Sequence, residues 1–538
     1  MKQEMLDFCR QRGILIDRSI LELLGDLQDL EIAKNLIERI EYQYKQKIIT
    51  KAFFYNNLNK VSEILMNYSG EDKRAIEDFL EKLGLDLKIL VFDEKLPQNN
   101  KKEEFFLNRN NHGINLLKIY QNQPKKIEVN DFVKNFRNRF NTLKNFLQER
   151  TELENLASIS RIENNKIFSL IAIVYDKKVT KNDNILLELE DLTGKVTAIV
   201  NKNRLDVYEK SKEIILDEVI GLKCSGSRDM VFVNDIVFPD IKLLEKKKSN
   251  KEELVAFTSD VHVGSDKFLE KNFLKFISWL NGKEGSEKQK EEALKVKYLF
   301  ITGDSVDGVG VYPGQETQLD IIDVRDQYKK LAELLLMIRN DVKIILCPGQ
   351  HDAVRVAEPQ PIIGETYGGA LYNLDNLYLV TNPSLIEVGT DVKFKVLMYH
   401  GASMHGIINS IDNLRMNRAH DYPTQIVKYM LKKRHLAPTH SLVTYTPLEN
   451  EDALLIKEIP DIVATGDLHR PEISDYNGIL LFSGSCWQSI TPFEEKVGNN
   501  PDPCKVPILN LQTREVKMLD FSDVNELDNK ENELGGEI

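Results

Sequence analysis

The stretch DIVATGDLHRP, residues 461–471, joins a short apolar run to polar groups that are able to bind a metal ion. The run at 462–465 ends at Gly466, and Asp467 and His469 follow it two residues apart. A short apolar run bounded by turn residues predicts a buried strand. The pair at its end fits either a polar turn or a metal site, and the other predicted strands decide between the two.

Four further segments have the same form, a predicted buried strand followed by Asp, His or amide groups. They are LVAFTSDVHVG with Asp260 and His262, YLFITGDSVDG with Asp304, VKIILCPGQHD with Gln350, His351 and Asp352, and FKVLMYHGAS with His400. Strands that alternate with helices from residue 254 to about 520 predict a layered α/β domain. Loops at the carboxyl ends of its strands converge. We therefore expect five ligand loops in one cleft, a nitrogen and oxygen set that suits two divalent cations.

The composition is that of a globular protein. The chain has 538 residues, 42% of them hydrophobic and 29% charged, which predicts three or four domains. No apolar run approaches the ~20 residues of a membrane helix, and five scattered cysteines indicate a reducing, cytoplasmic location rather than a disulfide framework. The net charge of −12 argues against a chain that coats nucleic acid by bulk charge, but leaves room for a local basic groove.

The pattern along the chain predicts a multidomain α+β protein. Residues 1–70 carry apolar positions at helical spacing, as in SILELLGDLQDLEIAKNLIERI, and predict a helical module. Short β-rich runs with turns such as DLTG (191–194) predict a barrel resembling an OB-fold. The expected segments are a helical module at 1–70, a linker at 71–126, a basic helix at 127–159, the barrel at 160–245, the α/β domain at 250–520 and an acidic tail at 521–538.

The segment 101–150 is locally basic, with 11 Lys or Arg against 5 Asp or Glu. Its helix-like part, DFVKNFRNRFNTLKNFLQER, has Phe132, Phe136 and Phe140 at a spacing of four, which favours a stripe facing the core. Aromatic residues among basic ones also bind single strands by stacking and charge. On that second interpretation the DNA-binding residues are Lys134, Arg137 and Arg139.

The ordered motifs resemble the calcineurin-like metallophosphoesterase superfamily, whose fold is a layered β-sandwich flanked by helices. Three segments are similar to the small subunits of archaeal family D DNA polymerase, also called DNA polymerase II: GDSVDGVGVYPGQE (303–316), PGQHDAVRVAEPQP (348–361) and NNPDPCKVPILNL (499–511). In that family the small subunit supplies a 3′-to-5′ exonuclease and forms a heterodimer with a large polymerising subunit. The resemblance implies a two-metal phosphodiesterase that acts on DNA with a single-stranded or frayed 3′ end.

The resemblance also implies a role for each group. The first cation would be held by Asp260, His262, Asp304 and His469. Asp304 would bridge to the second cation, whose other ligands would be Gln350, His400 and Asp467. His351 would be the acid that assists departure of the 3′ oxygen, and Asp352 would orient it.

The sequence departs from the family at two positions, both on the second cation. Gln350 stands where asparagine is usual, and Asp467 stands where histidine is usual. Both replacements keep an oxygen donor, and hard oxygen ligands suit manganese or magnesium. The departures therefore bear on the rate of hydrolysis more than on the existence of the site.

Two functions share every feature of this fold. The first is a proofreading 3′-to-5′ exonuclease within a DNA-directed DNA polymerase. The alternative is a catalytically weak or inactive scaffolding subunit that bridges the polymerising subunit to replication factors. A free-standing phosphoesterase is disfavoured, since GDSVDG (303–308) lacks the arginine that follows this motif in many phosphoprotein phosphatases. The intact first-cation ligands and His351 favour the exonuclease.

Overall fold

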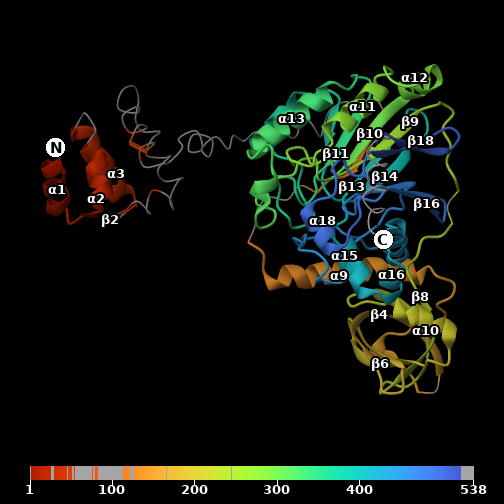
Figure 1. The fold of residues 1–538 in the computed structure, drawn as a ribbon. Helices are drawn as coiled ribbons and strands as arrows, with labels where there is room; N and C mark the ends of the chain where they lie inside the picture. Colours follow the sequence, from red (N-terminus) through yellow and green to blue (C-terminus); the bar gives the residue numbers. More distant parts are fainter. Residues whose placement is uncertain are drawn as a thin grey trace, which may run out of the picture. The chain divides into compact units, whose positions relative to one another are not determined.

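The computed structural model describes residues 2–25, 30–44, 47–50, 113–120, 126–164, 166–243 and 245–522, with single positions between 54 and 82. The chain divides into two compact units, 1–109 and 110–538 (Figure 1). Most of the predicted linker at 71–126 and the predicted tail from residue 523 onward lie outside the described residues. Among the described helices, none is long and apolar enough to cross a membrane.

The described part of the first unit consists mainly of helices. They are α1 (Lys2–Gln11), α2 (Arg18–Leu24) and α3 (Leu30–Tyr44). Apolar residues at helical spacing, such as Ile20 and Leu24 on α2, are buried together with Leu36 and Ile40 of α3. The two-residue strands β1 (Leu15–Ile16) and β2 (Ile48–Ile49) pair in parallel beside them.

The second unit contains a closed five-stranded barrel where the sequence predicts one. Its strands are β4 (Lys166–Val179), β5 (Ile185–Asp191), β6 (Gly194–Val200), β7 (Val219–Gly226) and β8 (Val231–Val237). They are paired in the order β4-β5-β6-β8-β7, and β4 also pairs with β7 to close the barrel. A helix that the sequence analysis missed, α10 (Leu205–Lys212), connects β6 to β7. The predicted turn at 191–194 is confirmed, since the Asp191 carboxylate accepts from the backbone of Thr193 and Gly194.

Two six-stranded sheets form the rest of this unit. The first has the order β12-β11-β10-β9-β18-β19 and the second β16-β17-β15-β14-β13-β3. Their strands are β3 (Ile114–Lys118), β9 (Leu254–Thr258), β10 (Val296–Thr302), β11 (Lys343–Cys347), β12 (Leu377–Leu379), β13 (Ser384–Val388), β14 (Phe394–Met398), β15 (Ile462–Thr465), β16 (Glu472–Tyr476), β17 (Ile479–Ser483), β18 (Lys505–Asn510) and β19 (Val516–Asp520). All five strands predicted to precede ligand groups are present.

An apolar core joins the two sheets into a sandwich. Phe257 and Phe300 of the first sheet stack on one another, and Phe257 also stacks on Phe482 of the second sheet with ring centroids 4.2 Å apart. The main flanking helices are α11 (Glu270–Leu280), α12 (Glu287–Leu294), α13 (Val324–Leu336), α15 (Met404–Ser410), α16 (Asp412–Met416), α17 (Thr424–Lys433) and α18 (Pro492–Val497). Helices α15 to α17 pack against the second sheet. The chain is therefore a mixed α+β protein with layered sheets.

One strand lies where the sequence analysis placed only linker. Strand β3 pairs antiparallel with β13 and forms the edge of the second sheet. Its residues alternate between the interior and solvent, with Ile114 buried. The α/β domain, expected to begin at residue 250, therefore also includes residues 114–118, because this strand completes its second sheet.

Helix α9 (Val129–Gln148) packs between the barrel and the sandwich (Figure 1). Phe140 and Leu143 pack with Val219 of the barrel, while Phe132 contacts the ring of Tyr445 in the sandwich. The core-facing interpretation of the Phe stripe is confirmed for Phe132 and Phe140 by these contacts.

Buried Arg139 fastens α9 to the sandwich. Its guanidinium donates to the Asp452 carboxylate at 2.7 Å and to the Pro438 carbonyl. Asn135 and His435 also bond to Asp452. Removing one member of such a pair leaves an uncompensated buried charge.

We predict that Arg139→Ala lowers the free energy of unfolding by about 3–5 kcal/mol, the range for breaking a buried ion pair. Guanidinium denaturation followed by circular dichroism measures the change. The matched control is Arg137→Ala on the exposed face of the same helix, which should change stability by less than about 0.5 kcal/mol. Equal midpoints for the two variants would contradict this account of Arg139.

Candidate metal centre

The ligand loops follow strands of both sheets and meet in one cleft. Asp260 and His262 follow β9, and Asp304 follows β10 in the same sheet; Gln350 follows β11. In the second sheet His400 follows β14, while Asp467 and His469 follow β15. The structure thus brings together every ligand residue that the sequence analysis named.

The backbone at five of these positions is strained. Asp260, His262, Asp304, Asp467 and His469 all have φ between 46° and 69°, the left-handed region. Asp and His reach this region more often than most residues, but sparsely populated conformations still cost of order 1–3 kcal/mol each. Such strain persists only where the surrounding structure fixes it, and it gathers at functional sites.

Glycines let the loops approach one another. A Cβ atom on Gly349 would lie 2.2 Å from the Asp304 carboxylate, and one on Gly303 would lie 2.1 Å from the His400 ring. Both contacts are far below van der Waals distance, so no other residue fits without displacing a candidate ligand.

Three imidazoles are oriented by a bond at Nδ1. His262 bonds through Nδ1 to the Asp307 carboxylate at 3.0 Å, and His469 bonds through Nδ1 to Glu494 at 2.8 Å. His400 uses Nδ1 to donate to the Thr302 carbonyl at 2.8 Å. In each ring Nε2 is therefore directed into the cleft. Metal-binding histidines commonly have this arrangement, in which a group bonded to the other ring nitrogen orients the ring.

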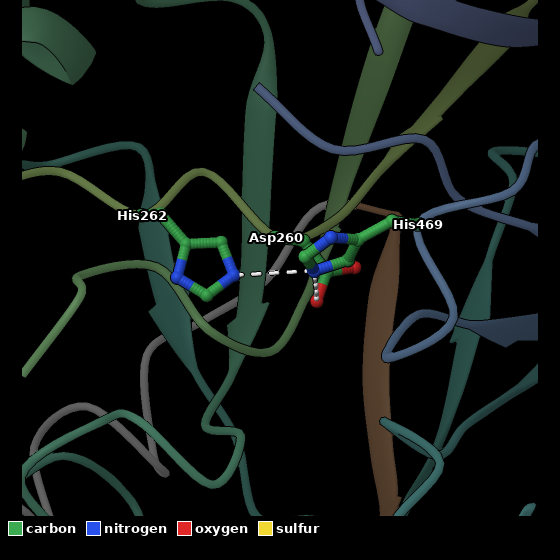
Figure 2. Close-up of side chains that lie close together, drawn as sticks. All are labelled: Asp260, His262 and His469. Atoms are coloured by element: carbon green, nitrogen blue, oxygen red, sulfur yellow. Dashed lines mark hydrogen bonds and ion pairs between the residues drawn. The ribbon is translucent and has the colours of Figure 1, made fainter. Parts of the chain in front are cut away.

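Asp260, His262 and His469 form the first group of candidate ligands (Figure 2). Their ligand atoms all lie within 4.8 Å of one another. The Nε2 atoms of His262 and His469 are 3.3 Å apart, and His469 Nε2 is 3.5 Å from the Asp260 carboxylate. Two nitrogens about 2.1 Å from one cation have a similar separation, so the group fits a divalent cation.

Asp304, His400, Gln350 and Asp467 form the second group. His400 Nε2 lies 3.2 Å from the Asp304 carboxylate, and the Gln350 amide donates to Asp467 at 2.9 Å. Within the described residues, His400 Nε2, Gln350 Oε1 and Asp467 Oδ2 are buried without a hydrogen-bond partner. Buried polar atoms are rarely left unpaired. A cation between these atoms would satisfy all three.

The buried charges shift one another's pKa. Burial alone would lower the pKa of His400, but the carboxylates of Asp304 and Asp260 outweigh it and hold that pKa well above its usual value. Burial would raise the pKa of Asp304, but the imidazoles of His400 and His351 lower it below the ordinary range. Without a metal, these shifts favour ionised Asp260 and Asp304 beside protonated His400, and a cation would take the place of that proton.

His351 lies beside the candidate ligands in a cavity of 330 Å³. Its Nδ1 lies 2.7 Å from the Asp307 carbonyl oxygen, and its backbone N–H donates to Asp304. Asp352, which was expected to orient His351, does not touch its ring. The buried Asp352 carboxylate instead accepts from Ser305 and from the Tyr328 hydroxyl. It fixes the loops after β10 and β11, and the group that orients His351 is the carbonyl of Asp307.

The three residues expected to bind DNA have different positions. Lys134 and Arg137 are exposed on α9, and Arg137 lines a cavity of 530 Å³ between α9 and the barrel. Arg139 is buried in its ion pair with Asp452. The expectation that Arg139 contacts a DNA strand is therefore wrong, because its guanidinium is buried and bonded to Asp452 and Pro438.

Sequence reasoning missed Glu494. Its side chain closes a capping box with Thr491 at the start of α18 and also orients His469. Burial raises the pKa of Glu494, but the His469 imidazole outweighs it and keeps the carboxylate ionised. The stretch TPFE (491–494) carries the signal of a helix start, but not of a contact with a residue 25 positions earlier.

Known proteins are similar to this chain over most of its length. Residues 255–474 match the family model of the B-type subunits of DNA polymerases alpha and epsilon. The chain is 38% identical over 396 residues to the DNA polymerase II small subunit of Methanothermobacter thermautotrophicus, covering 73% of this chain and 80% of that one. It is 34% identical over 497 residues to that of Archaeoglobus fulgidus, covering 90% and 97%. The match to the Methanocaldococcus jannaschii protein, at 37% identity, covers 71% and 64%.

Solved structures that match about half of this chain include an archaeal phosphodiesterase and Vps29 of Entamoeba histolytica complexed with zinc. The first is 14% identical with a TM-score of 0.23 and covers 49% of this chain and 98% of its own. The second is 16% identical with a TM-score of 0.22 and covers 50% and 99%.

We predict that Glu494→Gln weakens divalent cation binding about 10- to 100-fold, the usual effect of losing the carboxylate behind a metal-binding histidine. Glu495→Gln is the matched control, since Glu495 is exposed on the same helix turn. Titration of the metal-free protein with Mn²⁺ in a calorimeter measures both. If the two variants bind Mn²⁺ alike, Glu494 only caps α18.

Asp467→Ala should lose one of two bound cations and keep the other, which the first ligand group holds. Asp467→His should retain both, because it supplies another ligand at that position. Native mass spectrometry of the Mn²⁺-loaded variants counts the ions. Two ions on Asp467→Ala, bound as tightly as in the parent, would make Asp467 a turn residue only.

Proposed function

The chain belongs to the family of small subunits of archaeal DNA polymerase II, and on this premise we propose that it is a metal-dependent 3′-to-5′ exonuclease. Its substrate would be the phosphodiester at a single-stranded or frayed 3′ end. The observation that supports this best is a set of buried polar atoms that lack a hydrogen-bond partner among the described residues: Gln350 Oε1, Asp467 Oδ2 and His400 Nε2, of which the last has only ion-pair contacts, the shortest with Asp304. A protein that only bridges its partners has no physical need for them.

We propose two divalent cations, manganese or magnesium. Asp260, His262 and His469 would hold the first, and His400, Gln350 and Asp467 the second, with Asp304 shared between them. Bound there, such cations would polarise the phosphate and the attacking water and neutralise developing negative charge. Four of the seven ligands offer oxygen, which favours these hard cations over softer ones.

His351 is proposed as the general acid. With its Nδ1–H donated to the Asp307 carbonyl, the remaining nitrogen, Nε2, can present a proton toward the cavity. In the reaction a water oxygen bonds to phosphorus and releases one proton to solvent, the bond from phosphorus to the 3′ oxygen breaks, and His351 gives that oxygen its proton. The products are a 5′-mononucleotide and a strand shortened by one.

The proposed setting is replication. Relatives named as small subunits imply a partner, and we propose a heterodimer with a large polymerising subunit. In that assembly the exonuclease would remove a misincorporated 3′ nucleotide. The location that fits this role is the cytoplasm.

We also propose that the barrel is an OB-fold and that the sandwich domain is calcineurin-like. For the barrel, the support is the strand order β4-β5-β6-β8-β7 with α10 between its third and fourth strands. An OB-fold offers a surface for single strands, and Lys134 and Arg137 would add phosphate contacts beside it. We keep the domain boundaries expected from the sequence as proposals, with β3 assigned to the sandwich because it pairs with β13.

A scaffolding role remains the alternative because of one contact. The Gln350 amide donates to Asp467 at 2.9 Å, so the two residues that depart from the family pattern partly satisfy each other. A second cation must compete with this bond, which favours weaker hydrolysis than in relatives with asparagine and histidine.

The deciding experiment is a nuclease assay of the full chain on a 3′-frayed duplex, with and without the large subunit. We expect mononucleotides to be released from the 3′ end with Mn²⁺ or Mg²⁺, and none with a chelator. Absence of release under every condition, including the reconstituted heterodimer, would establish the scaffolding alternative.

We predict that His351→Ala lowers kcat by about 10²–10⁴-fold, the usual contribution of general acid–base catalysis. Mn²⁺ binding should stay close to that of the parent, because His351 is not among the proposed ligands. Single-turnover hydrolysis and calorimetry on the same preparation measure the two effects. A variant with the parent's rate would show that the acid lies elsewhere.

A further inference from the structure

A second cavity, of 180 Å³, adjoins the metal cleft. His405 and Asn499 line both cavities, so the two share a wall. The second cavity is lined in addition by Arg415, Arg418 and His420. We call this second cavity the arginine pocket. The proposed catalytic chemistry uses none of these three residues.

The two arginines are available to a ligand. Arg415 and Arg418 are 53% and 76% exposed, and each is paired with one carboxylate, Asp412 at 2.5 Å and Asp421 at 3.0 Å. Exposed ion pairs contribute only ~0–1 kcal/mol, so a phosphate can replace these partners at little cost. The planar guanidinium fork matches phosphate oxygens in two-point contacts.

Histidines connect this pocket to the metal cleft. His405 Nε2 lies 3.7 Å from the Asp467 carboxylate, and the rings of His405 and His420 have centroids 5.2 Å apart. The two histidines therefore line the cavity wall between a proposed metal ligand and the two arginines. The exposed ring of Tyr422 follows two residues after His420 and offers a face for base stacking.

We infer that the arginine pocket binds a second phosphate of the DNA strand, the one on the 5′ side of the scissile bond. This inference rests on the proposed function. In a 3′-to-5′ exonuclease the departing nucleotide carries a free 3′-hydroxyl and no further phosphate. Only the retained strand can then place another phosphate next to the metal cleft.

The test compares d(TpT), which has one phosphate, with d(TpTpT), which has two. The full-length parent with Mn²⁺ should cleave d(TpTpT) with the higher kcat/KM. Arg415→Gln/Arg418→Gln should lower kcat/KM for d(TpTpT) about 10- to 100-fold, the usual effect of losing hydrogen bonds to a charged group. The loss should appear in KM, as expected for binding that does not change in the transition state. Cleavage of d(TpT) should be unchanged.

Two further variants sharpen the comparison. Lys288→Gln/Lys295→Gln removes the same charge at α12, at the far end of the domain from α16 (Figure 1), and should leave both substrates unaffected. Asp421→Asn frees Arg418 from its carboxylate and should lower KM for d(TpTpT) about two- to fivefold. If the α12 variant reproduces the effect, it is general electrostatics and the inference is wrong.

Failure of the inference and of the proposed function are distinguishable. If the arginine variant keeps the parent's ratio between the two substrates while both are cleaved, the pocket is not a phosphate site and the exonuclease stands. Binding of both oligonucleotides is also measured by calorimetry with Ca²⁺. The parent could cleave neither oligonucleotide and still bind d(TpTpT) more tightly than d(TpT). If only the arginine variant then loses this difference in affinity, the pocket is a phosphate site and the exonuclease proposal is wrong. Equal binding in all variants overturns the pocket.

Discussion

Repulsion among three carboxylates, Asp260, Asp304 and Asp467, is the constraint on which the rest of the structure depends. They lie in one largely buried cleft, where an uncompensated charge is costly. The protein opposes this repulsion with three imidazoles, each held by a bond at its other nitrogen. Because these groups follow strands β9 and β10 of one sheet and β14 and β15 of the other, the two sheets must be aligned before the cleft exists. The stacked rings of the sandwich core supply that alignment.

The barrel is fixed to the sandwich by buried pairs of opposite charges. The buried Lys433 of α17 is paired with Glu218 at 2.7 Å, and Arg139 of α9 is paired with Asp452. Buried ion pairs contribute little net stability, but their geometry is specific. With α9 between them, barrel and cleft therefore keep one orientation. Any ligand that spans the barrel and the cleft would therefore meet both at a fixed angle.

Local pattern was enough to locate the five strands that precede the candidate ligand residues. Each apolar run followed by Asp, His or Gln is a signal contained within about ten residues, and its position in a layered α/β domain follows from general topology. The missed features are non-local. Strand β3 is recognised only through its pairing with β13, more than 260 residues later. The burial of Arg139 depends on Asp452, and the role of Glu494 depends on its approach to His469, which no spacing in the sequence announces.

The same limit explains the error at Asp352. Its place next to His351 in the chain suggested contact, but consecutive side chains in a loop point in different directions. The carboxylate turned inward to Ser305 and Tyr328, while the Asp307 carbonyl, from another loop, reached the His351 ring. Adjacency in sequence is therefore a weak guide to adjacency within a site built from five loops.

The left-handed backbone at five ligand positions has an evolutionary consequence. Glycine adopts this conformation without strain, so mutation to glycine there would relieve strain at the cost of a ligand. In a lineage that retained the subunit for assembly alone, selection would not remove such changes. Glycine would then accumulate at these positions of the cleft. In this chain all five positions still carry Asp or His. The conformational cost that they impose is one that only continued selection on the side chains would maintain.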